Sequence, residues 1–263
     1  MSAPSAANPS APAHVRVPQG DEPVLATSGL TKTFRGPSGP LVAVDNVSVN
    51  FMAAHVTAIV GESGSGKSTL ARMLLRLLPV TSGTITYSGG DVTHIHGRQL
   101  RHYWSQVQAV FQDPFASFNQ FFTVGDVLRR SLKLVNGGTE SREARIERCL
   151  GYVGLKPADC LAKFPHQLSG GQRQRVMIAR ALMMDPRVLI ADEATSMLDA
   201  SLRVGVLNEL RELRVKLNQS VLFITHDIGQ ACYLADRVVV MQHGRLVERG
   251  STDQVIFEPQ QDY

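Results

Sequence analysis

The chain has 263 residues, of which 43% are hydrophobic; this is enough for one large domain, or one domain with an insert, and excludes a disordered protein. The formal net charge of +4 would suit an anionic membrane surface or nucleic acid, and ordinary surface variation explains it equally well. The three cysteines, Cys149, Cys160 and Cys232, lie far apart without metal-ligand spacing, so we expect inert thiols in a reducing cytosol rather than disulfides or a metal site.

The start of the chain predicts neither a secretory signal nor a membrane anchor. Residues 1–22 are rich in Ala, Ser and Pro and have no periodic apolar face, which predicts a disordered tail. A short ordered extension packed on the domain is the alternative. No apolar run approaches the length of a membrane-spanning helix, so we expect a soluble cytoplasmic protein that reaches a membrane only through a partner.

The next segments predict antiparallel strands. Residues 25–34 and 41–52 alternate apolar and polar side chains around a Gly- and Pro-rich loop, and residues 83–87 form another such strand. Phe34 lies in the first of these strands. It can stack on a nucleotide base or simply be a half-buried strand aromatic, and the spacing leaves both readings open.

Between these strands lies a glycine-rich loop that fits the phosphate-binding pattern G-x-x-x-x-G-K-[ST]. Apolar residues 56–60 precede it as a buried strand, and residues 69–75 follow it as a helix. The glycines let successive N–H groups point at an anion, and the helix N-terminus adds partial positive charge. Lys67 supplies a full charge for the β- and γ-phosphates, and the Ser68 hydroxyl can ligate Mg²⁺. A merely flexible turn does not account for this register, so we predict that the chain binds a nucleoside triphosphate with Mg²⁺. The residues of the loop are Gly61, Glu62, Ser63, Gly64, Ser65, Gly66, Lys67, Ser68 and Thr69.

Further along, a short apolar strand at residues 107–111 ends at Gln112, and Pro114 prevents its continuation. From about residue 113 to residue 165 the apolar spacing is helical, notably at 124–134 and 141–153. We interpret this stretch as a small helical insert.

The last third of the chain alternates helices and buried strands. Ser169 is a candidate N-cap of one helix, residues 203–217 form another, and residues 188–191 and 220–225 are apolar strands. Residues 237–241 and 245–248 predict a hairpin. The predicted fold is α/β: a P-loop NTPase core with a mainly parallel sheet, an antiparallel β subdomain and a helical insert.

The polar residues that follow the strands carry the predicted chemistry, because ligands of open α/β sheets bind beyond the carboxyl ends of the strands. Asp192 can hold Mg²⁺ opposite Ser68, and Glu193 can orient and deprotonate a water, although a solvated acidic turn is the alternative. His226 can donate to the γ-phosphate and help fix Glu193; a lone His is more often structural. Gln112 can contact Mg²⁺ or the attacking water, but a single Gln carries little weight.

A second anion-binding helix start opens at Leu168. Its members that could contact phosphate are Ser169, Gly170, Gly171 and Gln172. One triphosphate needs only one phosphate-binding loop of this kind, and the P-loop already provides it. The second helix start can therefore contact a nucleotide that is bound to another copy of the chain. This implies a dimer with ATP at the interface.

From about residue 24 to its end the sequence resembles an ABC transporter ATPase subunit. The resemblance rests on the P-loop, on Leu168 to Gln172 with the Arg-Gln-Arg that follows, on the acidic pair at 192–193 and on the switch residue His226. It implies that Asp199 belongs to the family's D-loop and that Phe34 lies against adenine, where Tyr is more usual.

Within that family, residues 111–119 resemble the oligopeptide, dipeptide and nickel importer ATPases. Gln120 departs from the usual Pro of this subgroup, and residues 258–263 break off where members usually continue past a His-Pro-Tyr motif. The cysteine cluster of some members is missing, so no iron–sulfur site is expected.

The resemblance implies an ATP-hydrolysing subunit of a peptide importer at the cytoplasmic face of the cell membrane. Its implied partners are a second ABC ATPase subunit, identical or paralogous, two membrane permeases and, indirectly, an extracytoplasmic solute-binding protein; no nucleic acid is expected. Two alternatives stay open: a soluble phosphonate-degrading complex, and a soluble ABC ATPase in translation or DNA repair. The second usually carries paired cassettes or long coiled coils, which this sequence lacks.

Overall fold

The computed structural model describes residues 22–36, 39–112, 118–132 and 139–260. Several sequence predictions lie outside the described residues. They are the tail before Glu22, the middle of the loop near residue 38, residues 113–117 after Gln112, the Gly pair at 137–138 and the last three residues.

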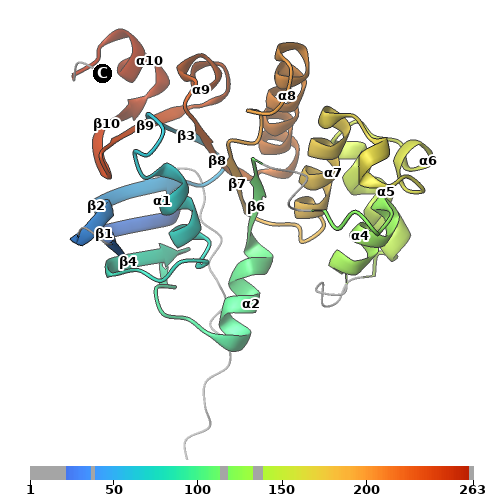
Figure 1. Ribbon diagram of the computed structural model, residues 1–263, viewed down its shortest axis with the longest axis horizontal. Coiled ribbons are helices and arrows are strands. Elements are labelled where there is room, and N and C mark those ends of the chain that lie inside the picture. The colour runs from blue at the N-terminus through green and yellow to red at the C-terminus, as the bar shows by residue number, and fades with distance from the viewer. Residues whose placement is uncertain (1–21, 37–38, 113–117, 133–138, 261–263) are drawn as a thin grey trace, which may run out of the picture.

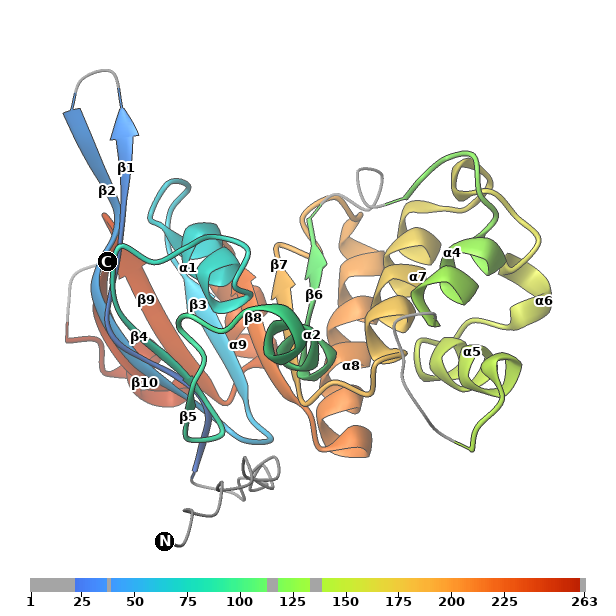
Figure 2. The ribbon, with the colours of Figure 1, turned by 90° about the horizontal axis from the view of Figure 1, so that it is seen from below.

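One sheet is antiparallel and has the strand order β2-β1-β4-β5. Its strands are β1 (Pro23–Gly36), β2 (Gly39–Met52), β4 (Ser82–Tyr87) and β5 (Gly90–Asp91). β1 and β2 form a long hairpin that projects from the molecule, as Figure 2 shows. The predicted antiparallel piece is therefore present, with β5 as an additional short edge strand.

The second sheet has six strands in the order β10-β9-β3-β8-β7-β6. Its strands are β3 (Val56–Val60), β6 (Val107–Phe111), β7 (Val188–Asp192), β8 (Ser220–Thr225), β9 (Arg237–Gln242) and β10 (Arg245–Ser251). All neighbours are parallel except β9 and β10, which form the predicted antiparallel hairpin. The mainly parallel α/β architecture is thus confirmed (Figure 1).

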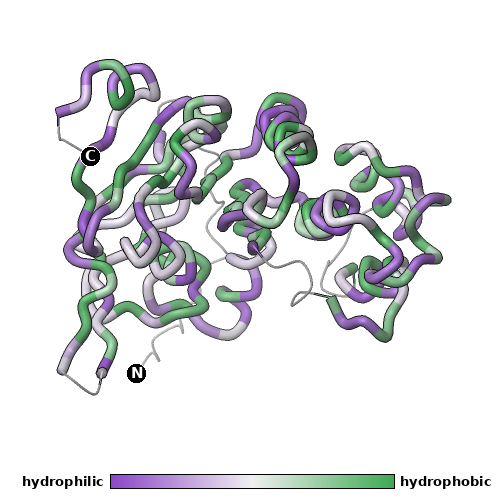
Figure 3. The backbone as a smooth tube through the Cα atoms, turned by 45° about the horizontal axis from the view of Figure 1, so that its top comes forward, coloured by the Kyte–Doolittle hydropathy of each residue, from purple (hydrophilic) through white to green (hydrophobic). Residues whose placement is uncertain are grey.

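The central strands are apolar throughout because both faces of this sheet are covered. Alternate side chains enter two different cores. Ile59 and Ile190 pack with the helix after the P-loop, whereas Ala191 and Phe223 pack on the other face with the helices of the last third of the chain. Figure 3 shows apolar segments along the strands and mixed polarity along the helices.

The helices within the described residues, in order, are α1 (Lys67–Leu74), α2 (Gly97–Gln106), α4 (Val124–Ser131), α5 (Arg142–Tyr152), α6 (Pro157–Cys160), the 3₁₀ turn η2 (Pro165–Gln167), α7 (Gly170–Leu182), α8 (Ala200–Leu217), α9 (Ile228–Leu234) and α10 (Thr252–Phe257). From α4 to α7 they form a block on one side of the six-stranded sheet (Figures 1 and 2). Within the described residues, none of the helices is both long and apolar enough to cross a lipid bilayer.

The structure adds helices that the sequence analysis did not predict, among them α2 and α9. α2 is mostly polar, and it is held by two aromatic donors: the Tyr103 hydroxyl donates to the carbonyl of Leu74, and the Trp104 indole donates to the carbonyl of Leu75 at 2.8 Å. α8 begins three residues before the predicted start because Asp199 takes the N-cap position.

Candidate functional site

The loop between β3 and α1 has the backbone that its glycines predict. Gly61 and Gly66 have φ values of +153° and +101°, which residues with a side chain rarely adopt. A Cβ atom at Gly66 would lie 2.3 Å from the carbonyl oxygen of Ala43 on β2. Glycine at this position therefore lets the loop pack directly against the antiparallel sheet.

Lys67 begins α1 and is only 4% exposed. Its Nζ donates to the carbonyls of Gly61 and Glu62 at 2.6 and 2.7 Å, and lies 3.3 Å from Ser65 Oγ. Burial lowers the pKa of Lys67, while the nearby carboxylates of Glu193 and Asp192 act in the opposite direction. The ammonium group is thus held inside the curl of the loop, beside two acidic side chains from β7 and the turn that follows.

Asp192 ends β7 and contacts the residue after Lys67. Ser68 Oγ donates to Asp192 Oδ1 at 3.0 Å, across 124 positions of sequence. Burial raises the pKa of Asp192, and the hydrogen bond from Ser68 partly offsets this rise. A hydroxyl and a carboxylate at this separation form a pair of hard oxygen ligands, the type that Mg²⁺ prefers.

Gln112 lies at the same edge of the sheet. Its predecessor Phe111 pairs with Asp192 in the parallel register of β6 and β7, so Gln112 follows directly beyond that pair. Its side chain is exposed. The strand end predicted from the sequence therefore places Gln112 next to the acidic residues.

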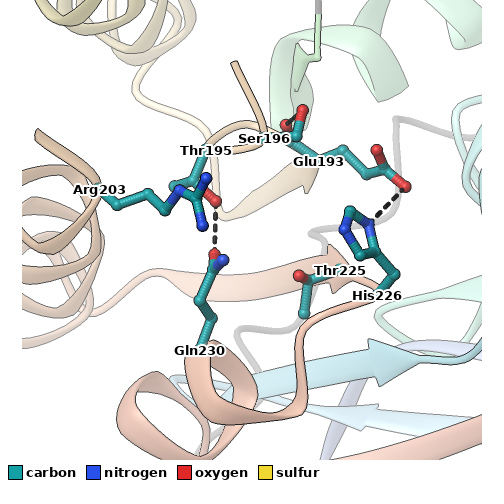
Figure 4. A pocket seen from close by; sticks show the side chains of 7 residues that line it. All are labelled: Glu193, Thr195, Ser196, Arg203, Thr225, His226 and Gln230. Carbon is teal, nitrogen blue, oxygen red and sulfur yellow. Dashed lines mark hydrogen bonds and ion pairs between the residues drawn. The ribbon is translucent and has the colours of Figure 1, made fainter. Parts of the chain in front are cut away.

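Glu193 has a left-handed backbone with a φ of +49°, which is unfavourable for a residue with a side chain. Its N–H donates to Ile224 O at 3.0 Å, and its carbonyl accepts from the N–H and the hydroxyl of Ser196 at 3.1 and 3.0 Å. These bonds hold the turn that aims the Glu193 side chain. Glu193 Oε1 lies 3.5 Å from Nδ1 of His226, whose side chain is 60% exposed after β8 (Figure 4).

A small pocket opens beside this pair. Its lining residues are Glu193, Thr195, Ser196, Arg203, Thr225, His226 and Gln230 (Figure 4). The sequence analysis named only Glu193 and His226 among them as site residues, so it missed Thr195, Ser196, Arg203, Thr225 and Gln230. The two threonines flank predicted strand ends and could have been found by extending the search there, whereas Arg203 and Gln230 come from helices α8 and α9 and carried no signal.

The second helix start, at Ser169, has the predicted capping geometry. Ser169 Oγ accepts from the N–H of Gln172 at 3.2 Å, and Gln172 Oε1 accepts from the N–H of Ser169 at 3.1 Å. Both ribbon views place α7 in the helical block, apart from α1 (Figures 1 and 2). The structure therefore does not bring Ser169 to the P-loop of the same copy.

Asp199 lies close to that helix start. A Cβ at Gly170 would contact Leu198, and one at Gly171 would contact Leu202, so the turn before α8 packs against the beginning of α7. Asp199 itself is exposed, and its side chain makes no capping hydrogen bond. The carboxylate thus faces outward beside the second helix start.

Phe34 lies on the β1–β2 hairpin opposite Leu41 and is 37% exposed. Nζ of Lys32 lies 5.1 Å from the centre of its ring. Ala43, two positions beyond Leu41, is the residue that packs against Gly66 of the P-loop. The ring therefore lies on β1, paired with the strand β2 that contacts the loop, and it is partly exposed to solvent.

Comparisons with known proteins match more than half of the chain. The family model described as ABC transporter matches residues 44–196, which include the P-loop, the second helix start and the acidic pair after β7. A putative peptide import ATP-binding protein of Brucella ovis is 40% identical over 244 residues, covering 92% of this chain and 77% of that protein. The dipeptide transport ATP-binding protein DppF of Lactococcus lactis subsp. cremoris is 40% identical over 246 residues, covering 91% of this chain and 78% of that protein.

A solved structure is also similar over most of its length. The dimeric post-hydrolysis state of the ATP-binding cassette MJ0796, bound to ADP and Pi, matches with a TM-score of 0.77 and 27% identity, covering 87% of this chain and 98% of that chain. The family model, the relatives and the solved structure thus all identify an ABC-type ATP-binding cassette in this chain. The chain belongs to the ABC transporter family, as one of its ATP-hydrolysing cassettes.

Proposed function

We propose that this cassette hydrolyses ATP to drive peptide uptake through membrane permeases. The observation that carries the ATPase chemistry is the meeting of Ser68 and Asp192 at 3.0 Å beside the pair formed by Glu193 and His226. The names of the relatives, which refer to peptide import and dipeptide transport, support peptides as the transported class.

Ser68 and Asp192 would hold Mg²⁺, with Gln112 at the same edge as a further oxygen ligand. The donor set fits the ion, because it offers hydroxyl, carboxylate and amide oxygens. When bound, Mg²⁺ neutralises charge on the β- and γ-phosphates. Lys67 binds the same phosphates from the loop, and the backbone N–H groups of residues 61–69 orient them.

Glu193 is proposed as the group that orients the attacking water and accepts its proton. The side chain is 20% exposed, so water can reach it although most of its surface is covered by protein. His226 Nδ1 lies within 3.5 Å of the carboxylate and would fix its direction or donate to the γ-phosphate. Phe34 would lie against the adenine.

The nucleotide is proposed to sit between two cassettes. Within one copy the residues of the second helix start, Ser169 to Gln172, lie in a different part of the molecule from the P-loop, and Asp199 faces outward next to them. A partner copy, identical or paralogous, would bring these groups to the γ-phosphate. The similar cassette MJ0796 is dimeric, which supports this arrangement.

We further propose one ATPase domain over residues 23–263, with a helical subdomain at about 113–165 that transmits closure to two membrane permeases. The cassette would then lie at the cytoplasmic face of the membrane, and an extracytoplasmic solute-binding protein would deliver the peptide. Phe121, which is 88% exposed before α4, is an apolar contact of the kind that such a permease would cover.

The test combines co-purification with peptide uptake. A tagged chain should recover membrane permeases, and cells lacking it should lose uptake of a labelled dipeptide. Wild-type chain should restore uptake, Asp192→Asn should not, and Asp253→Asn, the same change at an exposed position of α10, should behave as wild type. Recovery of ribosomes, DNA or a soluble lyase core in place of permeases would overturn the proposal.

A further inference from the structure

One side chain bridges the two segments that carry Glu193 and His226. The Gln230 carboxamide on α9 accepts a hydrogen bond from Thr195 Oγ1 at 2.5 Å, as Figure 4 shows. Its Nε2 donates to Asp227 Oδ2 at 2.8 Å. Thr195 lies two residues after Glu193, and Asp227 directly follows His226, so the amide joins the two turns.

The chemistry of the three groups fixes the direction of the bridge. Hydrogen bonds from Gln230 lower the pKa of Asp227, so its carboxylate is ionised and can only accept. The amide nitrogen must therefore face Asp227, and the amide oxygen faces Thr195. The Thr195 side chain is 2% exposed, so the amide oxygen receives a hydroxyl that is shielded from bulk water.

On the Glu193 side, the bridge is attached to a turn whose backbone conformation is unfavourable. The left-handed Glu193 is held by the bond from its N–H to Ile224 and by the Ser196 bonds to its carbonyl. The first of these bonds ties Glu193 itself to β8, and the Ser196 bonds close the turn. Thr195 adds a second tether, from the far side of the turn to α9.

On the His226 side, the ring is exposed and cannot be held by packing. Its neighbours are held instead. The Asp227 N–H donates to Thr225 Oγ1 at 3.0 Å, and Asp227 Oδ1 accepts from the N–H of Gln230 at 3.1 Å. The backbone on both sides of His226 is thus held in place.

We propose that Gln230, through Thr195, is a positioning residue for ATP hydrolysis that sets the separation of Glu193 and His226. The capping of α9 by Asp227 explains the bonds between Gln230 and Asp227, but it does not explain the bond to Thr195, which belongs to another segment. This inference rests on the proposed roles of Glu193 and His226. Gln230 itself reaches neither reacting group; it acts on their relative position.

The experiment measures steady-state ATP hydrolysis by the purified membrane complex carrying Gln230→Met, Thr195→Val, both changes, or Thr195→Ser. Each of the first two removes one partner with little change in volume. We expect kcat to fall about fivefold to twentyfold, because small errors in the geometry of reacting groups slow the chemical step. KM for ATP should stay within about twofold, since the P-loop is unchanged.

The double variant and the serine variant separate positioning from general damage. Both single changes break the bond between Thr195 and Gln230, and Gln230→Met also loses the bond to Asp227. Gln230→Met with Thr195→Val should therefore be about as slow as Gln230→Met alone. Thr195→Ser keeps the hydroxyl and should restore most of the rate. Tyr233→Phe is the matched control: it removes another bond from α9, that of the Tyr233 hydroxyl to Asn208 Oδ1 at 2.6 Å, and should leave kcat unchanged.

Wild-type kcat in Gln230→Met or Thr195→Val would overturn the inference while leaving the ATPase function intact. So would a double variant whose loss is the product of the single losses, a KM effect without a kcat effect, or no rescue by Thr195→Ser. A wild-type complex that does not hydrolyse ATP would overturn the proposed function, and with it this inference.

Discussion

Lys67→Met separates nucleotide binding from folding, because Lys67 bonds to the carbonyls of its own loop and is proposed to bind the phosphates as well. Methionine has a similar length but no charge and no donors. A charge about 4 Å from a phosphate contributes roughly 4 kcal/mol at an effective dielectric constant of 20, and a hydrogen bond to a charged group contributes about 1.5–3 kcal/mol net. We expect a loss of about 3 kcal/mol in ATP binding, which is a rise of roughly 150-fold in Kd.

The effect of Lys67→Met on stability should be small, because two contributions oppose each other. The carbonyls of Gly61 and Glu62 lose their donor, at a cost of about 1–3 kcal/mol. The burial that lowers the pKa of Lys67 is relieved at the same time, since no charge remains to be desolvated. The free energy of unfolding without nucleotide should therefore change by less than about 1.5 kcal/mol.

Isothermal titration calorimetry with Mg²⁺-ATP and urea unfolding without nucleotide measure the two quantities. Lys216→Met is the matched control: it makes the same change in net charge, but at an exposed ion pair with Glu212 on α8, where both side chains are 56% exposed. The control should match wild type in both assays, since exposed pairs contribute about 0–1 kcal/mol. Wild-type affinity in Lys67→Met would refute the phosphate-binding role of Lys67.

Three further predictions concern the second helix start, the metal ligand and a buried acid. Ser169→Arg should leave ATP binding to the isolated chain within about twofold but stop hydrolysis by the assembled pair; turnover with the partner present would contradict the dimeric arrangement. Asp192→Asn should raise at least tenfold the Mg²⁺ concentration that gives the half-maximal effect on ATP binding, measured by titrating Mg²⁺ at fixed ATP. An unchanged titration would exclude Asp192 as a ligand of the metal. Burial raises the pKa of Glu209, which pairs with Arg175 at 2.7 Å, from 4.5 to about 7, so the folded chain retains a proton there that the unfolded chain has lost. Stability should therefore fall as the pH rises from about 4.5 to about 7, and Glu209→Gln should remove on the order of 2 kcal/mol of that fall in urea unfolding; an identical pH profile would contradict the assignment.

Most strands of the six-stranded sheet could be predicted from the sequence because helices cover both faces of that sheet. Strands such as β7 and β8 are buried on both faces and so are apolar throughout, and their polar successors, Asp192 and His226, mark where they end. α2 escaped prediction because its sequence is largely polar. Its position depends on Tyr103 and Trp104 bonding to the end of α1, a tertiary contact that spacing does not report.

The site was only partly predictable for a similar reason. Motif and strand-end reasoning named the residues that would contact ATP, and it predicted Ser169 as an N-cap, which the structure contains. The left-handed backbone of Glu193 has no sequence signal, because Glu does not favour that conformation. Gln230 meets Thr195 across 35 positions, and only the packing of α9 against the turn after β7 brings them together.

The central claim is that Glu193 accepts the proton of the attacking water within an ATP-bound pair of cassettes. Glu193→Gln keeps the size and hydrogen bonding of the side chain but removes the proposed base, and we expect Lys67 and Asp192 still to hold the nucleotide and its metal. The measurement is ATP turnover together with size-exclusion chromatography and retained nucleotide, each in Mg²⁺-ATP and in ADP. The account predicts a loss of about a hundredfold to ten-thousandfold in turnover, and a dimer or occluded ATP that accumulates only in Mg²⁺-ATP. Turnover within a few-fold of wild type would contradict it and would transfer the role of base to His226.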